Sequence, residues 1–298
     1  MTTFATSNVP AMTGRTVVVT GANSGIGRAA ARALATKGAR VVLAVRSPEK
    51  GYEAAATMTG NVEVRRLDLA DIASIRAFAE NLTEPVDILI NNAGVMIPPL
   101  TRTADGFELQ FGTNHLGHFA LTNLLLPQIR ERVVTVSSNG HKTGSIDFDD
   151  LNWERKPYRA MPAYSQSKLA NLLFTAELHR KLTRAGSPIL ATAAHPGMAA
   201  TNLLSSGSRR LTTRLTEKAA TLLAQSDEDG ALPTLYAAVA DIPGGSYAGP
   251  SGFMEGRGAP KLVSRSAKAR DTALAQRLWD VSESLTGVAF PQHALRAP

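Results

Sequence analysis

The chain has 298 residues with a formal net charge of +7, and its 44% apolar and 19% charged residues are typical of a soluble globular protein and argue against disorder. It contains no cysteine, which excludes a disulfide framework, a thiolate metal site and a cysteine nucleophile. No apolar run approaches the roughly 18 residues that cross a bilayer and the N-terminus does not resemble a signal peptide, so we expect a cytoplasmic protein without a membrane anchor.

Short β-branched runs alternate with helical segments along the whole chain. In chain order we predict strand 16–20, helix 28–37, strand 40–45, a helix from Pro48, strand 62–67, helix 71–80, strand 86–90, one long helix 106–126, strand 132–137, helix 164–182, strand 189–194, a helix from Ser226 and a short strand 246–248. Such alternation produces βαβ units. The sequence therefore predicts an α/β fold, a Rossmann-type doubly wound parallel sheet with helices on both faces.

No repeat, low-complexity tract or long linker divides the chain. We predict a disordered N-terminal tail over 1–13 and one domain over 14–298, with a variable substrate region at about 199–225. In open α/β sheets, ligands bind beyond the carboxyl ends of the strands, where the motifs below fall.

A glycine-rich turn follows the first predicted strand, within the segment 20–27, which reads TGANSGIG. Glycine at 21 allows a sharp exit from the strand, glycine at 25 lets backbone approach a pyrophosphate, and glycine at 27 lets the helix pack close to the sheet. An ordinary glycine-rich turn is the alternative, but the position between strand and helix favours a dinucleotide site. The expected contacts are Gly21, Asn23, Ser24, Gly25, Ile26 and Gly27.

The end of the second predicted strand bears on the choice of nucleotide. A free ribose 2′-hydroxyl requires an acidic residue there, whereas this chain has Arg46 and no carboxylate before Glu49. A guanidinium can bind a 2′-phosphate and stack on adenine, so the sequence favours NADP(H) over NAD. The alternative is an ordinary surface arginine.

Tyr164 and Lys168 lie four residues apart on a predicted helix and so share one face. A nearby ammonium, together with any positive charge on a cofactor, favours the phenolate form of tyrosine, and a shift of about three pKa units would need about 4 kcal/mol. We therefore expect Tyr164 as the acid–base group. Lys168 could also bind ribose hydroxyls.

Two further polar residues come from neighbouring elements. Ser138 follows a strand and could hold a substrate oxygen beside Tyr164, while Asn114 lies inside the long predicted helix. Asparagine is a poor helix former, so Asn114 is either exposed to solvent or holds a water for proton relay. Ser138 lacks the G-x-S-x-G elbow of hydrolases.

The remaining charged and metal-binding residue types have simpler interpretations. His115 and His118 lack the third ligand that a zinc site needs, so we expect no metal, and we expect His195 to orient backbone near a cofactor. The basic segments 209–218 and 257–270 are solvated surface or a docking face for an anionic partner. Nucleic acid is not expected, because aromatic residues make up only 5% of the chain.

Together these motifs resemble the short-chain dehydrogenase/reductase family over about residues 14–250. The resemblance implies that Asn114, Ser138, Tyr164 and Lys168 form its catalytic set. It further implies that the nucleotide site includes residues that match the family's other motifs: Asp68, Leu69, Asn91, Ala93, Gly94, Pro196, Gly197 and Thr201, with Tyr164 and Lys168. It also implies dimers or tetramers, which the family commonly forms.

Within the family, the stretches 114–119 (NHLGHF) and 165–171 (SQSKLAN) are similar to the retinol-dehydrogenase-like branch, which includes WW-domain oxidoreductases. Two departures argue against retinol itself as the substrate: the membrane-anchoring segment of the animal enzymes is missing, and the region after Thr201 is rich in Ser, Arg and Thr. The segment 147–153 resembles an insertion of this branch, which would shape the pocket or block helix packing between subunits.

The leading hypothesis is an NADP-dependent oxidoreductase that interconverts an alcohol and a carbonyl in a small-molecule substrate. Two alternatives stay open. One is a catalytically silent nucleotide-binding scaffold or sensor, and the other is a reductase of a conjugated C=C bond.

Overall fold

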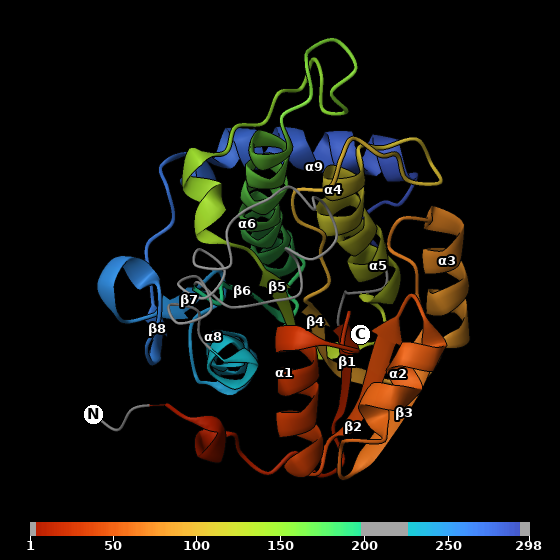
Figure 1. Cartoon of the computed structure of the whole chain (residues 1–298), viewed down its shortest axis with the longest axis vertical. Coiled ribbons are helices and arrows are strands. Elements are labelled where there is room, and N and C mark those ends of the chain that lie inside the picture. Colours follow the sequence, from red (N-terminus) through yellow and green to blue (C-terminus); the bar gives the residue numbers. More distant parts are fainter. Residues whose placement is uncertain (1–3, 198–225, 293–298) are drawn as a thin grey trace, which may run out of the picture.

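In the computed structural model, which describes residues 4–197 and 226–292, eight strands form one sheet in the order β3-β2-β1-β4-β5-β6-β7-β8 (Figure 1). All neighbours are parallel except β8, which runs antiparallel to β7. The strands are β1 (Thr16–Thr20), β2 (Arg40–Val45), β3 (Asn61–Arg66), β4 (Val86–Asn91), β5 (Ile129–Val136), β6 (Leu190–Ala194), β7 (Tyr247–Pro250) and β8 (Pro260–Leu262). The predicted doubly wound α/β fold is confirmed.

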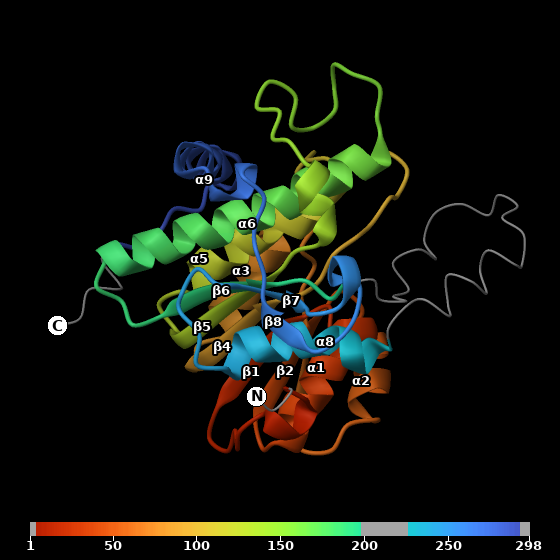
Figure 2. The ribbon, with the colours of Figure 1, turned by 90° about the vertical axis from the view of Figure 1, so that its left-hand side faces the viewer.

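Helices cover both faces of the sheet (Figure 2). On one face lie α1 (Gly25–Thr36), α2 (Pro48–Ala55) and α8 (Asp227–Val239), and on the other lie α3 (Ile72–Asn81), α5 (Gly117–Leu125) and α6 (Ala160–Arg184). The short α4 (Leu109–Phe111) precedes α5, and α9 (Thr272–Thr286) packs outside α5 and α6.

The β-branched run of β1 shows why the predicted strands form. Val17 and Val19 contribute to the core under α1 and α8, whereas Val18 contributes to the core under α3 and α5. All three side chains are fully buried. A strand covered on both faces needs apolar residues at every position, which its sequence supplies.

The predicted helix 106–126 is wrong in its first turn and in its regularity. Helical structure begins at Leu109, where the Glu108 carboxylate accepts the N–H groups of Gln110 and Phe111. A π-helical turn over Gly112–Leu116 then interrupts the α-helical pattern. Such turns often occur at functional sites because they change the direction of individual backbone groups.

The predicted disordered tail is also wrong for the part that the structure describes, from residue 4. Val9 and Met12 are buried, and the Met12 N–H donates to the Lys37 carbonyl at 2.8 Å. The Phe4 ring packs edge-on against Tyr236 of α8 at 5.2 Å between centroids. The segment therefore closes the apolar space below α1 and α8.

Two C-terminal elements were not predicted, namely β8 and α9. Strand β8 is only three residues long, and α9 carries Trp279. The Trp279 ring stacks on Phe174 of α6 at 5.7 Å and meets Phe119 of α5 edge-on at 4.9 Å. Trp279 therefore joins α9 to α5 and α6.

The 147–153 insertion folds on itself beyond the N-terminal end of α6, where its loop projects from the molecule (Figures 1 and 2). Asp150 accepts the N–H groups of Glu154 and Arg155, and the guanidinium of Arg277 lies 4.0 Å from the Phe148 ring centre. Trp153 is buried at a left-handed φ of 57°. The insertion thus packs towards α9.

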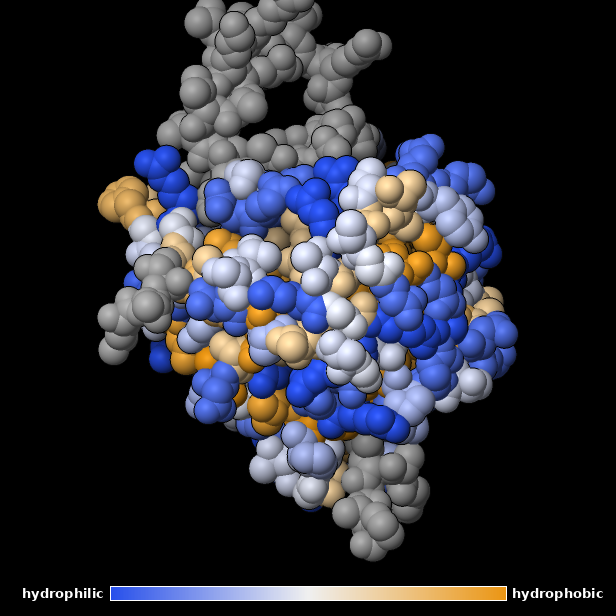
Figure 3. Space-filling model, turned by 90° about the horizontal axis from the view of Figure 1, so that it is seen from below, coloured by the Kyte–Doolittle hydropathy of each residue, from blue (hydrophilic) through white to orange (hydrophobic). Residues whose placement is uncertain are grey.

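Hydrophilic and hydrophobic residues are interspersed on the face in Figure 3, as on most soluble domains. In the segment 257–270, Arg257, Lys261 and Arg270 are exposed, while the Lys268 ammonium donates to the Gly144 carbonyl at 3.1 Å. The other basic segment, 209–218, lies outside the described residues. Among those that are described, no helix combines the length and hydropathy that crossing a bilayer requires.

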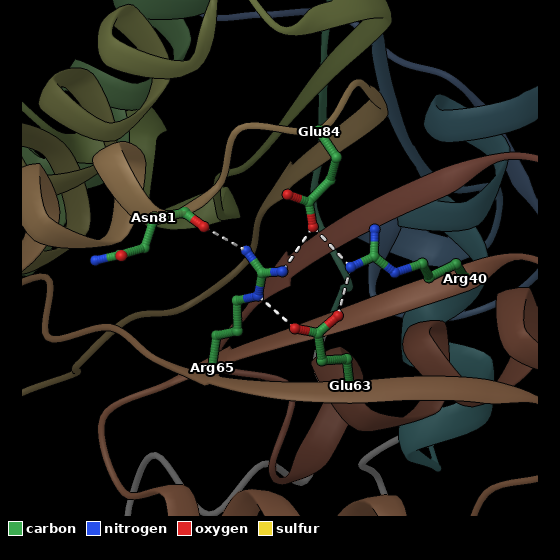
Figure 4. A network of polar contacts seen from close by, with 5 residues as sticks. All are labelled: Arg40, Glu63, Arg65, Asn81 and Glu84. Carbon is green, nitrogen blue, oxygen red and sulfur yellow. Dashed lines mark hydrogen bonds and ion pairs between the residues drawn. The ribbon is translucent and has the colours of Figure 1, made fainter.

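A four-residue ion network joins β2, β3 and the loop before β4 (Figure 4). The Arg40 guanidinium contacts the carboxylates of Glu63 at 2.5 Å and Glu84 at 2.6 Å, and Arg65 contacts the same two carboxylates at the same distances. Burial alone would raise the pKa of Glu84, but the Arg40 hydrogen bond and the Arg65 charge outweigh it and hold this pKa at about 2.

We expect Glu84→Gln to lower the free energy of unfolding by about 1 kcal/mol at pH 7, because both arginines lose a charged partner at a half-buried site. The folded-state pKa lies below the unfolded value, so this contribution is complete above about pH 4.5 and is lost as the pH falls towards 2. Urea unfolding at pH 7 and pH 3 measures it, with the exposed Glu80→Gln on α3 as a control. An equal stability loss at both pH values would contradict the linkage.

Candidate active site

The glycine turn joins β1 to α1 and is tightly packed. Gly21 has a φ of 67°, and a Cβ there would lie 2.9 Å from the Ala93 backbone. A Cβ on Gly27 would lie 2.3 Å from the Asn92 side-chain nitrogen and 2.8 Å from the Gly21 carbonyl oxygen. The helix begins at Gly25, three residues before its predicted start, so the turn presents the free N–H groups of the α1 N-terminus.

A cavity of about 730 Å³ opens at the carboxyl ends of the parallel strands. It runs from the glycine turn and the end of β2 to the end of β5 and the first turns of α6. The predicted site residues in its wall are Gly21, Asn23, Ser24, Gly25, Ile26, Gly27, Arg46, Asp68, Leu69, Ala93, Gly94, Ser138, Tyr164, Lys168, Pro196 and Gly197. The structure thus brings together residues from separate motifs around one cavity.

One end of the cavity is positively charged. Arg46 follows β2 and is exposed, and Lys50 lies four residues later on α2. Ser47 caps this helix by accepting the Lys50 N–H, and neither cation has an ion-pair partner among the described residues. Two cations beside a helix N-terminus can bind a phosphate group.

The other end holds Ser138, Tyr164 and Lys168. The Tyr164 hydroxyl hydrogen-bonds Ser138, and the Lys168 ammonium lies 5.6 Å from the centre of the Tyr164 ring. Both α6 side chains are buried, with 8% and 5% of their surfaces exposed. Helix α6 begins at Ala160, so this pair lies in a regular part of the helix.

The pKa of Tyr164 depends on its burial and on its contact with Ser138. Burial raises it above the ordinary value of a phenol, and the Ser138 hydrogen bond opposes this only in part. Burial also lowers the pKa of Lys168 to about 8, and its ammonium donates to the Val136 carbonyl at 3.2 Å rather than to the phenol. The protein's own groups therefore keep the phenol form, and the predicted shift towards the phenolate, which included a positive cofactor charge beside Lys168, stays a prediction.

Asn114 is fully buried in the π-helical turn, which rules out the solvent-exposed alternative and leaves the water-relay role as a prediction. Its Oδ1 accepts the Val95 N–H at 2.8 Å, and its Nδ2 donates to the Val95 carbonyl and the Ser167 hydroxyl at 3.0 Å. A Cβ on Gly94 would lie 3.2 Å from this Oδ1 and 3.6 Å from the Lys168 ammonium. Asn114 thus stands behind the cavity wall, next to Lys168.

Among the described residues, the predicted nucleotide contact Asn91 does not line the cavity. It is fully buried at the end of β4, where its side chain donates to the Thr122 hydroxyl at 2.8 Å. The adjacent Asn92 lines the cavity instead and donates to the Thr20 carbonyl. Thr201 and the region 199–225 lie outside the described residues.

Sequence reasoning missed Asn92, Ser47 and Lys50. The alternation of side chains along a strand could have identified Asn92, because only one residue of an adjacent pair can face the cavity. Lys50 could have been found from Pro48, since a helix that begins there places residue 50 in its first turn beside Arg46.

The histidines have separate partners. The His115 ring contacts the Ser282 hydroxyl of α9 and the His118 ring contacts the Thr20 hydroxyl, both at 2.9 Å. His195 accepts the Gly197 N–H at 3.2 Å, which fits its predicted role in orienting backbone at the cavity. Within residues 4–197 and 226–292, no group of three His, Asp or Glu side chains is arranged to hold a metal ion.

Comparison with known proteins identifies close relatives. Residues 15–211 match the family model described as short chain dehydrogenase. Human retinol dehydrogenase 13 is 45% identical over 93% of this chain and 86% of its own length. A crystal structure of an uncharacterized protein from Mycobacterium paratuberculosis is 51% identical, with a TM-score of 0.86 over 97% of this chain and all of that one. A crystal structure from Beutenbergia cavernae is 28% identical, with a TM-score of 0.57 over 77% of this chain and 91% of that one. That protein is named as a putative NAD(P)-dependent gluconate 5-dehydrogenase, and its structure contains NADP at low occupancy.

Proposed function

The chain belongs to the short-chain dehydrogenase family and resembles its retinol dehydrogenases, and from this premise we propose that it is an NADP-dependent oxidoreductase that interconverts an alcohol and a carbonyl compound. The observation that carries the proposal is that one and the same cavity has Ser138, Tyr164 and Lys168 at one end and Arg46 at the other.

The cavity fits a dinucleotide in size and chemistry. Gly21 and Gly27 let the turn pack closely against Ala93 and Asn92, and the α1 N-terminus offers N–H groups to a pyrophosphate. Arg46 and Lys50 would hold a 2′-phosphate, and Asp68 and Leu69 would flank the adenine. When bound, the nicotinamide nucleotide supplies hydride to a carbonyl carbon or accepts it from an alcohol carbon.

The protein's part in carbonyl reduction is to hold the substrate oxygen and give it a proton. Ser138 donates a hydrogen bond to that oxygen, and Tyr164 transfers its phenolic proton to it. Because burial raises the pKa of Tyr164, the phenol is protonated at neutral pH, as a proton donor must be. Lys168 stabilises the phenolate that is left, and Asn114 helps to resupply its proton.

The name of retinol dehydrogenase 13 supports primary alcohols and their aldehydes as the first substrates to test. Purified protein is assayed with NADPH and with NADH against a panel of aldehydes, ketones and enones, and products are identified by mass spectrometry. We expect alcohol products, faster with NADPH. Saturated carbonyl products would support the C=C reductase instead. Nucleotide binding without turnover of any panel member would support the scaffold or sensor.

Nucleotide preference gives a separate prediction. Arg46→Asp should weaken NADPH binding by roughly 10- to 100-fold relative to NADH, because a charged hydrogen bond to phosphate contributes about 1.5–3 kcal/mol. Fluorescence titration measures both dissociation constants. Arg66→Asp is the matched control, since Arg66 pairs with Val45 at the end of the adjacent strand but lies outside this cavity. Equal effects of the two substitutions would place 2′-phosphate recognition elsewhere.

A further inference from the structure

His118 connects the glycine turn to the π-helical turn that holds Asn114. The ring is buried on α5, with 1% of the residue's surface exposed. Its Nε2 lies 2.9 Å from the Thr20 hydroxyl at the end of β1, and its Nδ1 lies 3.0 Å from the Asn114 carbonyl oxygen. One side chain thus joins the start of the nucleotide turn to the backbone of a predicted catalytic residue.

Counting hydrogens assigns the tautomer of this ring. The Thr20 hydroxyl oxygen accepts two backbone N–H groups, from Asn92 and Ala93, each at 2.9 Å, which uses both of its lone pairs. Its single hydrogen has His118 Nε2 at 2.9 Å as a nearer acceptor than the Ile90 carbonyl at 3.4 Å. Nε2 is therefore unprotonated, and Nδ1 carries the hydrogen that it donates to the Asn114 carbonyl.

The surroundings keep the ring neutral. Burial, opposed by the hydrogen bond to the Asn114 carbonyl and assisted by the neighbouring Lys168 charge, lowers the pKa of His118 to about 4. Near neutral pH the ring therefore holds one hydrogen in one place and acts as a fixed link.

The link matters because it is a side-chain contact that ties the Asn114 carbonyl to the Thr20 hydroxyl at the start of the nucleotide turn. The π-helical turn changes the regular hydrogen-bond pattern around Asn114, while its side chain is anchored to Val95 and Ser167 beside Lys168. A displacement of the Asn114 backbone would therefore move the side chain that adjoins the Lys168 ammonium.

We propose, on the basis of the function proposed above, that His118 is a positioning residue: as the Nδ1–H tautomer it fixes the Asn114 carbonyl relative to the nucleotide turn at Thr20, and so aligns Asn114 and Lys168 for returning a proton to Tyr164. His118 does not touch the cavity and transfers no proton itself.

Two substitutions separate the two contacts of the ring. His118→Asn keeps a donor for the carbonyl four residues earlier, as Asn123 does on the same helix by donating to the Phe119 carbonyl at 2.9 Å. His118→Gln places its amide farther out, near Thr20, and loses the bond to Asn114. His115→Gln is the matched control, because His115 is equally buried three residues earlier, in the π-helical turn, but contacts Ser282 of α9.

The experiment measures NADPH affinity, the pH dependence of kcat and the solvent deuterium isotope effect on carbonyl reduction. For His118→Gln we expect kcat to fall by roughly ten- to a hundredfold with a larger isotope effect and unchanged NADPH affinity. His118→Asn should recover most of kcat, and His115→Gln should lower the melting temperature but not alter the pH profile. Equal loss in the Asn and Gln variants, or the same changes in His115→Gln, would overturn the proposal.

Nitrogen-15 NMR of histidine-labelled full-length protein tests the tautomer without turnover. We expect a neutral Nδ1–H ring at pH 7 for the signal that His118→Asn removes. An Nε2–H ring would overturn the proposal even in an active enzyme. If the wild type reduces no carbonyl, the proposed function fails, and with it the positioning role, whatever the tautomer.

Discussion

Replacing Tyr164 by phenylalanine is expected to reduce kcat for carbonyl reduction by about 10²- to 10⁴-fold, the range that a positioned proton donor contributes. The ring that packs in the cavity wall is retained, and only the hydroxyl that bonds Ser138 is lost. NADPH affinity should therefore be preserved. Steady-state kinetics and fluorescence titration of the same preparations measure the two quantities.

Tyr158→Phe is the matched control for this prediction. Its hydroxyl is also hydrogen-bonded, donating to the Glu108 carboxylate at 3.0 Å and accepting from the Gln110 amide at 2.9 Å, but it lies outside the cavity wall. It should cost stability and leave kcat nearly unchanged. A Tyr164→Phe variant that turns over at the wild-type rate would remove this hydroxyl from the mechanism.

The second large effect is expected from Lys168→Met, which keeps the length of the side chain and removes its charge. We expect kcat/KM to fall by about 10²- to 10³-fold through loss of the charge that stabilises the phenolate. In contrast to Tyr164→Phe, NADPH affinity should fall too, because this ammonium is expected to bind the ribose. The two variants are thus distinguished by nucleotide titration.

The wild-type pH profile carries a related signature. Burial lowers the pKa of Lys168 to about 8, so its ammonium is present at pH 7 and is lost as the pH rises through 8. Carbonyl reduction should therefore decline above about pH 8 in the wild type, and the residual activity of Lys168→Met should lack that decline. Lys181→Met, whose ammonium lies over the Trp279 ring, should keep the decline. A wild-type profile flat to pH 10 would contradict the assignment.

The strands and the cavity were predictable because their residues are constrained locally. The run Val17 to Val19 is apolar at every position because helices cover both faces of the sheet. Glycine occupies positions 21 and 27 because a Cβ there would collide with Ala93 or Asn92. The glycine motif can be recognised from its own spacing between strand and helix, although the contacts that require it come from residues 92 and 93. Both patterns therefore remain visible in a single sequence.

What could not be predicted depends on contacts between distant segments. The burial of Asn114 follows from its bonds to Val95 and Ser167, and the order of the N-terminal segment follows from Tyr236 of α8. The raised pKa of Tyr164 depends on how deeply the folded chain buries it, which the Y-x-x-x-K spacing does not encode. Helix α9 was missed for the same reason, since its contacts are with α5 and α6.

The position of α9 has a consequence for self-assembly. Through Trp279, α9 covers Phe119 of α5 and Phe174 of α6. These apolar side chains are therefore buried within the chain itself and not against another molecule. A buried tryptophan removes about 200 Å² from water, which corresponds to about 5 kcal/mol of apolar burial that a competing copy would have to replace. Deleting the C-terminal helix is therefore expected to expose Phe119 and Phe174 and to promote association between copies of the chain.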